Sequence, residues 1–147
     1  MTRFLSMVSM ALGGTVYVLW RPLSLNMFSW FEAIGLGRPV GGLRTWAAPY
    51  FSSLPSWTIL SLPQALWVLS GCLAVHSIWK DITSVPEQLW MGGVLLLGVG
   101  FEVGQALGLV PGVFDVWDLS MILIAYVAAQ GISWSINRSQ VAKKVCT

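Results

Sequence analysis

The sequence predicts an all-α membrane protein with four transmembrane helices and a long Trp-rich interfacial loop between the first two. Hydrophobic residues make up 56% of the chain and charged residues 10%, whereas ordinary soluble domains carry roughly 25% charged residues. The chain also contains four apolar runs, each close to the ~20 residues that cross a hydrocarbon core. Nine tryptophans agree, because Trp concentrates at the headgroup level of bilayers. We therefore expect a single polytopic membrane domain over residues 1–147.

The four predicted spans are separated by polar residues and turns. Pro63 stands in the first turn of the second span, where its missing N–H costs nothing. The Val110-Pro111-Gly112 turn between the last two spans is too short for anything but an antiparallel hairpin. The first span lacks a cleavage site and is interpreted as an uncleaved anchor. In order, the spans are residues 4–20, 62–79, 89–110 and 113–136, followed by a tail at 137–147.

Residues 21–61, the loop between the first two spans, are rich in aromatic side chains. Residues 25–36 are predicted to form a short amphipathic helix lying in the membrane interface. Loops of this length are usually functional or covered by partners, so we expect the segment to lie over the outer mouth of the bundle. A further full span is excluded by several helix breakers, namely Gly35, Gly37, Pro39, Gly41 and Gly42.

Basic residues predict the orientation of the spans. With an even number of spans, both termini and the 80–88 loop face the same side of the membrane. That side carries Arg3, Lys80, Arg138, Lys143 and Lys144, and the other carries Arg21, Arg38 and Arg44. Because cytoplasmic loops carry the excess of Lys and Arg, both termini are predicted to be cytoplasmic. The junction of the last two spans then falls in the outer half of the membrane.

Polar side chains gather at this junction. A charged group at the bilayer centre costs roughly 2.5–3.5 kcal/mol, so carboxylates persist there only with partners or water. Glu102 and Gln105 are three residues apart and share a helix face. Asp115 and Asp118 have the same spacing, and Tyr126 continues their stripe. The candidate ligand-binding residues are therefore Glu102, Gln105, Asp115, Asp118 and Tyr126.

Structural roles are open for the same carboxylates. Asp115 is also placed to be the N-cap of the last span, with Asp118 as its third residue, in a variant of the capping box. Their negative charge suits the positive end of the helix dipole. Glu102 lies in the middle of its predicted span, so its structural alternative is a protonated residue or one bonded to Gln105.

Other residues suggest packing or cofactor roles. Gly100, Gly104 and Gly108 form a small-xxx-small ridge that predicts close helix packing. His76, the only histidine, cannot by itself assemble a zinc site. Three roles are open for it: a hydrogen-bonded structural residue, a proton-handling residue, or an axial ligand of haem or chlorophyll. We predict no metal and no cofactor other than lipid.

The Glu102-Val-Gly-Gln105 and Asp115-Val-Trp-Asp118 motifs resemble the VanZ-like family of small polytopic bacterial membrane proteins, named for a teicoplanin-resistance factor. That family carries a Glu-x-x-Gln helix, a turn and an Asp-x-x-Asp helix start. The resemblance covers these motifs and the four-span layout, and it implies a bacterial inner (cytoplasmic) membrane protein. The chain departs from the family at three positions, where Gly112, Ile122 and Ala125 replace the usual Arg, Asn and Gly.

Two functional hypotheses follow. In the first, the outer-leaflet acidic site binds a lipid headgroup or an amphiphilic ligand, because carboxylates accept strong hydrogen bonds at low dielectric. In the second, the chain is an accessory subunit of a larger, pigment- or lipid-bearing membrane complex, docking through its Trp-rich loop and glycine ridge. No nucleophile, metal or nucleotide motif predicts an enzyme. The net charge of +2 is too small and scattered for nucleic acid.

Overall fold

The structure, a computed structural model, describes residues 1–79, 85–110 and 112–145, and its regular elements are all helical. Two helices, α1 (Thr2–Trp20) and α6 (Val85–Ala106), are long and apolar enough to cross a membrane. So is the stretch Val116–Ile136 of α7 (Val116–Val145). A further apolar helix, α5 (Leu62–Ile78), is shorter. The all-helical class is thus confirmed, and the three long apolar helices indicate a membrane protein.

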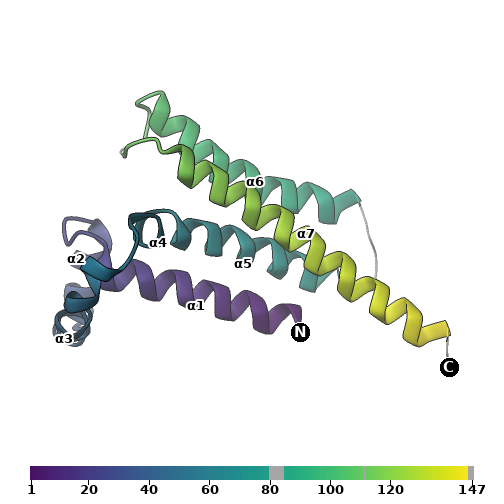
Figure 1. Cartoon of the computed structure of the whole chain (residues 1–147), viewed down its shortest axis with the longest axis horizontal. Coiled ribbons are helices and arrows are strands. Elements are labelled where there is room, and N and C mark those ends of the chain that lie inside the picture. Colours follow the sequence, from purple (N-terminus) through teal and green to yellow (C-terminus); the bar gives the residue numbers. More distant parts are fainter. Residues whose placement is uncertain (80–84, 111, 146–147) are drawn as a thin grey trace.

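The central helix of the bundle is α5, which packs against α1, α6 and α7 (Figure 1). The main core combines side chains from α5, α6 and α7, with α6 and α7 running antiparallel as predicted. Its fully or nearly buried members are Val68, Cys72, Met91, Ile122 and Ala129. At the centre of this core, a Cβ added to Gly98 would lie 3.1 Å from Val68 and 3.3 Å from Ile122. Gly98 therefore lets three helices approach one another closely.

Small residues join α1 to α5. The buried face of α1 consists of Thr2, Ser6, Ser9 and Gly13. The Ser6 hydroxyl donates to the backbone oxygen of Ser70 at 2.9 Å, and the Ser70 hydroxyl donates to the backbone oxygen of Ser6 at 2.8 Å. Such small and hydroxyl-bearing residues are typical of helix contacts in membranes. This seam was not predicted from the sequence.

The boundaries of the last two helices differ from those predicted. The third predicted span, 89–110, is a helix from Val85 to Ala106, because Pro86 is tolerated in a first helical turn. Gly108, with φ of +68°, ends the helix in the left-handed conformation that favours glycine. The predicted tail after residue 136 is helical as far as Val145. Hydropathy marks the lipid-facing stretch, whereas backbone hydrogen bonding continues beyond it.

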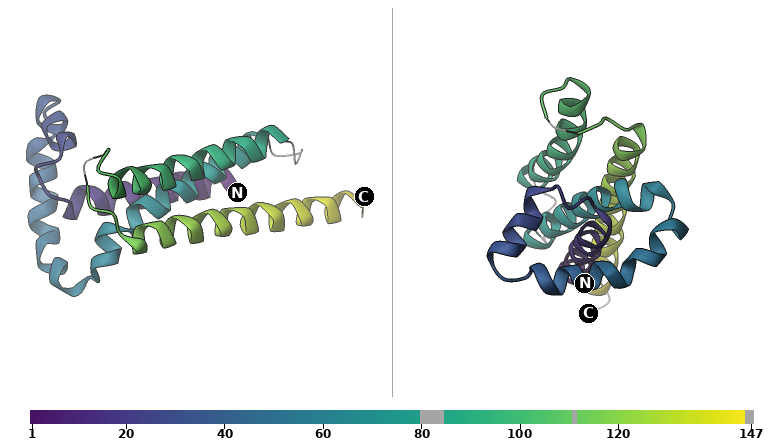
Figure 2. Two further views of the ribbon diagram at one scale, coloured as in Figure 1. Left: turned by 90° about the horizontal axis from the view of Figure 1, so that it is seen from above. Right: turned by 90° about the vertical axis from the view of Figure 1, so that its left-hand side faces the viewer.

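The segment 21–61 lies across one end of the bundle, the end that also holds the connection between α6 and α7 (Figure 2). Its elements are α2 (Asn26–Ala33), α3 (Gly37–Ala47), the 3-10 helix η1 (Ala48–Ser53) and α4 (Ser56–Leu60). The predicted helix within 25–36 corresponds to α2. By contrast, α3 falls among the helix breakers that were expected to exclude a further full span, and its 11 residues are too few for one. Pro39 is accommodated there because it falls in the first turn.

Arg44 of α3 attaches this segment to α1. Its guanidinium donates to the backbone oxygens of Val18 and Arg21 and lies 4.8 Å from the ring centroid of Phe28. A cation at the C-terminus of a helix also complements the helix dipole. The segment is thereby held over the end of the bundle.

Candidate functional site

Glu102 is completely buried, with 0% of its surface exposed. The Gln64 side-chain amide of α5 donates a hydrogen bond of 3.1 Å to its Oε1. Because α6 ends at Ala106, Glu102 lies close to the C-terminal end of the helix. The expectation that it is in the middle of its helix was therefore wrong. Glu102 is buried because neighbouring helices pack around it, and not because it lies in the middle of its own helix.

The start of α7 brings two further carboxylates to this place. Asp115 accepts a hydrogen bond of 2.9 Å from the backbone N–H of Trp117 and therefore caps α7, as the structural interpretation predicted. Asp118 is buried, and its carboxylate and the backbone of Asp115 lie close enough to Glu102 to interact with it electrostatically. Within the described residues, Oε2 of Glu102 and Oδ1 of Asp118 are buried without hydrogen-bond partners. The structure thus brings the three predicted carboxylates together.

The other two candidate residues make contacts of their own. Gln105 packs on Gly112, where an added Cβ would be 2.5 Å from its Nε2. Tyr126 accepts a hydrogen bond of 3.0 Å from the amide of Gln130. Eight residues separate it from Asp118, or about 12 Å along a helix. Tyr126 therefore belongs to the middle of α7 rather than to the acidic end.

A cavity of about 560 Å³ lies beside Gln64, between α1, α5 and α6. Its volume falls in the range of small-molecule sites, roughly 300–1,000 Å³. No carboxylate is among the described residues that line it. Its polar lining comes from Tyr17, Arg21, Gln64, Trp67 and Gln105, and the remainder of the lining is mainly apolar. Gln64 is thus shared between the cavity and the buried Glu102.

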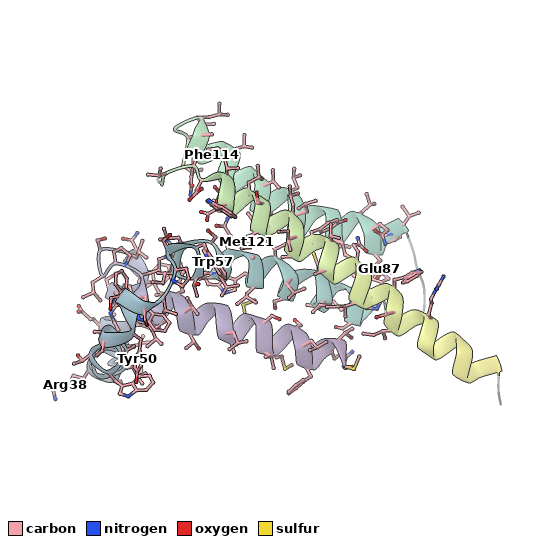
Figure 3. All side chains as sticks on the ribbon, viewed as in Figure 1. Arg38, Tyr50, Trp57, Glu87, Phe114 and Met121 are labelled. Carbon is pink, nitrogen blue, oxygen red and sulfur yellow. The ribbon has the colours of Figure 1, made fainter. Side chains whose placement is uncertain are left out.

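A second buried carboxylate lies at the opposite end of α6 (Figure 3). Oε1 of Glu87 lies 2.6 Å from Nδ1 of His76, and the two side chains are 2% and 1% exposed. Sequence reasoning missed Glu87 by placing it in a loop. The signal was its spacing of 15 residues from Glu102, with Met91 and Gly98 on the same buried stripe. His76 thus makes the hydrogen bond that its structural role predicted, and the proton-handling and axial-ligand roles stay predictions.

The glycine ridge makes no contact between helices within the described chain. Gly100 and Gly108 have open space where a Cβ would lie, and Gly104 faces Val110 of the following connection. The predicted helix packing at these glycines is therefore corrected: α6 approaches its neighbours at Gly98. The described residues also hold no cluster of three or more His, Cys, Asp and Glu placed for a metal ion.

Comparisons with protein-family models, curated proteins and solved structures found no match for this chain. A function must accordingly be argued from the geometry and chemistry of its own site.

Proposed function

We propose that this chain is a small VanZ-like protein of the bacterial inner membrane that binds the polar head of a lipid or another amphiphile. The carrying observation is the buried Glu102, bonded to Gln64 at the wall of a largely apolar cavity. Buried carboxylates in membrane segments are costly and commonly mark functional sites. The apolar walls suit a hydrocarbon chain, and the polar end suits a headgroup.

In this proposal all four apolar helices cross the membrane. α5 has 17 residues, or about 26 Å at 1.5 Å per residue, and it packs between helices of spanning length. Four crossings put both termini on the cytoplasmic side by the distribution of basic residues. The acidic end of the hairpin and the segment 21–61 then face the outer leaflet, where segment 21–61 lies in the interface.

Gln64 is the residue through which a ligand reaches the carboxylate. Its amide nitrogen donates to Glu102, so its amide oxygen remains as an acceptor for a hydroxyl or ammonium group. A headgroup in the cavity therefore contacts Gln64 directly and Glu102 through it. The low dielectric of the site strengthens both hydrogen bonds.

Lipid retention by a Glu102→Gln variant tests this proposal. Wild-type protein, purified from its source membrane in mild detergent, is expected to keep a lipid or amphiphile visible by native mass spectrometry. Glu102 holds the Gln64 amide that contacts the ligand, and a neutral amide at position 102 makes a weaker hydrogen bond to Gln64 than a carboxylate does, so Glu102→Gln should lower the affinity for that ligand about tenfold. Glu32→Gln, at an exposed carboxylate of α2, is the matched control. Equal retention by all three proteins would contradict the proposal.

The second candidate function, an accessory subunit of a membrane complex, is favoured by a different observation. Trp30 and Trp46 of the segment 21–61 are each 66% exposed, and Gly100 of α6 has open space before it. These are surfaces on which a partner helix could pack. Purification in mild detergent should then recover stoichiometric partners or pigment. A lone, colourless 16.1 kDa monomer would count against this function.

A further inference from the structure

Within the described part of the chain, Arg21 at the edge of the cavity is a cation without an acidic partner. It follows α1, and its Nη2 donates to the backbone oxygen of Leu60 at 2.8 Å. Its guanidinium lies 5.3 Å from the ring centroid of Tyr17. Nε is buried and has no acceptor among the described residues, and no carboxylate there forms an ion pair with the guanidinium. Since Arg carries five N–H donors, most of its hydrogen-bonding capacity is left for a ligand.

The cavity divides into a polar part and an apolar part. Gln64 and Gln105 join Arg21 in the polar part. The apolar part is built from α5 and α6 and includes Val68, Val94 and Leu97. α1 and α6 lie on different sides of α5 (Figure 1), and residues of all three helices line the cavity. Its composition matches a molecule with one anionic end and one hydrocarbon end.

A second arginine adds positive charge at the same end of the bundle. Arg44 donates from Nη2 to the backbone oxygen of Arg21 at 2.8 Å, so the two side chains are held close to the same turn of chain. Among the described residues, Arg44 also has no carboxylate in ion-pair distance. Arg44 does not line the cavity, but its charge, which no described carboxylate neutralises, adds to the positive potential at this end of the bundle.

We infer that this cavity binds a membrane phospholipid, with the phosphate diester at Arg21 and an acyl chain along α5 and α6. The inference rests on the proposed function and names the ligand class of that site. The planar guanidinium matches the geometry of phosphate oxygens, and it stays positively charged because its pKa lies far above neutral pH. Gln64 and Gln105 hydrogen-bond the remainder of the headgroup. The apolar walls select a lipid over free phosphate.

The test titrates delipidated protein in detergent with dioleoylphosphatidylglycerol or with dioleoylglycerol, which lacks the phosphate, and counts bound lipid by native mass spectrometry. Wild type should bind the phosphatidylglycerol at least tenfold more tightly. Arg21→Gln should weaken phosphatidylglycerol binding about tenfold to hundredfold, as expected for a charged hydrogen bond. Arg38→Gln removes the same charge from an exposed position of α3 and should leave binding unchanged.

Further arms separate the alternatives. Leu97→Trp is designed to fill the apolar part of the cavity while Arg21 is kept, and it should also weaken phosphatidylglycerol binding about tenfold. This second variant keeps the inference testable if the Arg21 variant does not fold. Inorganic phosphate that competes as well as the phospholipid would overturn the choice of a lipid. Equal affinity for both lipids, or an unaltered Arg21→Gln variant, would overturn the phosphate assignment. A dimer that closes the cavity without lipid would overturn it as well. Loss of a co-purified ligand in Glu102→Gln would still support the proposed function in each case.

Discussion

Two carboxylates are buried along α6, and each contacts α5, yet their surroundings differ. Glu87 lies 2.6 Å from His76, a side chain able to carry the opposite charge. Glu102 has the neutral Gln64 as its partner and Asp118 as an acidic neighbour. A protonated imidazole can compensate a buried carboxylate within the protein, although Nε2 of His76 itself has no hydrogen-bond partner among the described residues. The contrast suggests that Glu87 makes a structural contact and that Glu102 belongs to a ligand site.

Removing the imidazole should have the largest effect on stability. His76→Ala takes away the partner of a buried carboxylate, and such losses cost about 3–5 kcal/mol in the free energy of unfolding. Gln64→Ala at the other end removes a neutral donor and should cost about 1–3 kcal/mol. Unfolding in mixed detergent micelles, followed by circular dichroism, compares the two. Equal losses of unfolding free energy in the two variants would contradict the distinction between a structural contact at Glu87 and a ligand site at Glu102.

The connection between α6 and α7 lies at the Glu102 end of α6, so a change in it should affect that end alone. Gly112 has φ of +143°, and an added Cβ would lie 2.5 Å from the Gln105 amide. Gly112→Ala should therefore lower the free energy of unfolding by about 1–3 kcal/mol through backbone strain and crowding. Adding Gln105→Ala should recover the crowding part of this loss. The pair His76–Glu87 should be unaffected, which histidine side-chain NMR signals can verify.

The smallest effect is expected at the helix cap. Asp115→Ala removes the acceptor for the Trp117 N–H and should cost about 1 kcal/mol in thermal unfolding. Asp115→Asn keeps that acceptor and should be nearly neutral. If the Asn variant were as unstable as the Ala variant, the charge of Asp115 and not its cap would matter. That result would indicate that Asp115 acts together with Glu102 and Asp118 as one acidic group at this end of the bundle.

The positions of the apolar helices could be predicted because lipid-crossing stretches have a strong hydropathy signal. The predicted 4–20 and 62–79 differ from α1 and α5 by only one or two residues. The grouping of Glu102 with Asp115 and Asp118 followed from the hairpin. Whether all four apolar helices cross the membrane stays a prediction.

Other features carry no such signal. α3 contains Gly37, Pro39 and two further glycines, and local propensity disfavoured a helix that Arg44 and tertiary packing hold in place. The partnership of His76 and Glu87 depends on the register between α5 and α6, which spacing along one helix does not specify. The cavity likewise arises from how three helices pack, and Arg21 had looked like a simple orientation signal.

The length of α7 has a mechanical consequence. Its 30 residues form a continuous rod of about 45 Å, while its apolar stretch ends at Ile136. Because Asp118 stands near one end, a tilt of roughly 10° there displaces the far end by about 8 Å over that length. A small rotation of α7 at its acidic end would therefore produce a larger displacement at the opposite end of the helix.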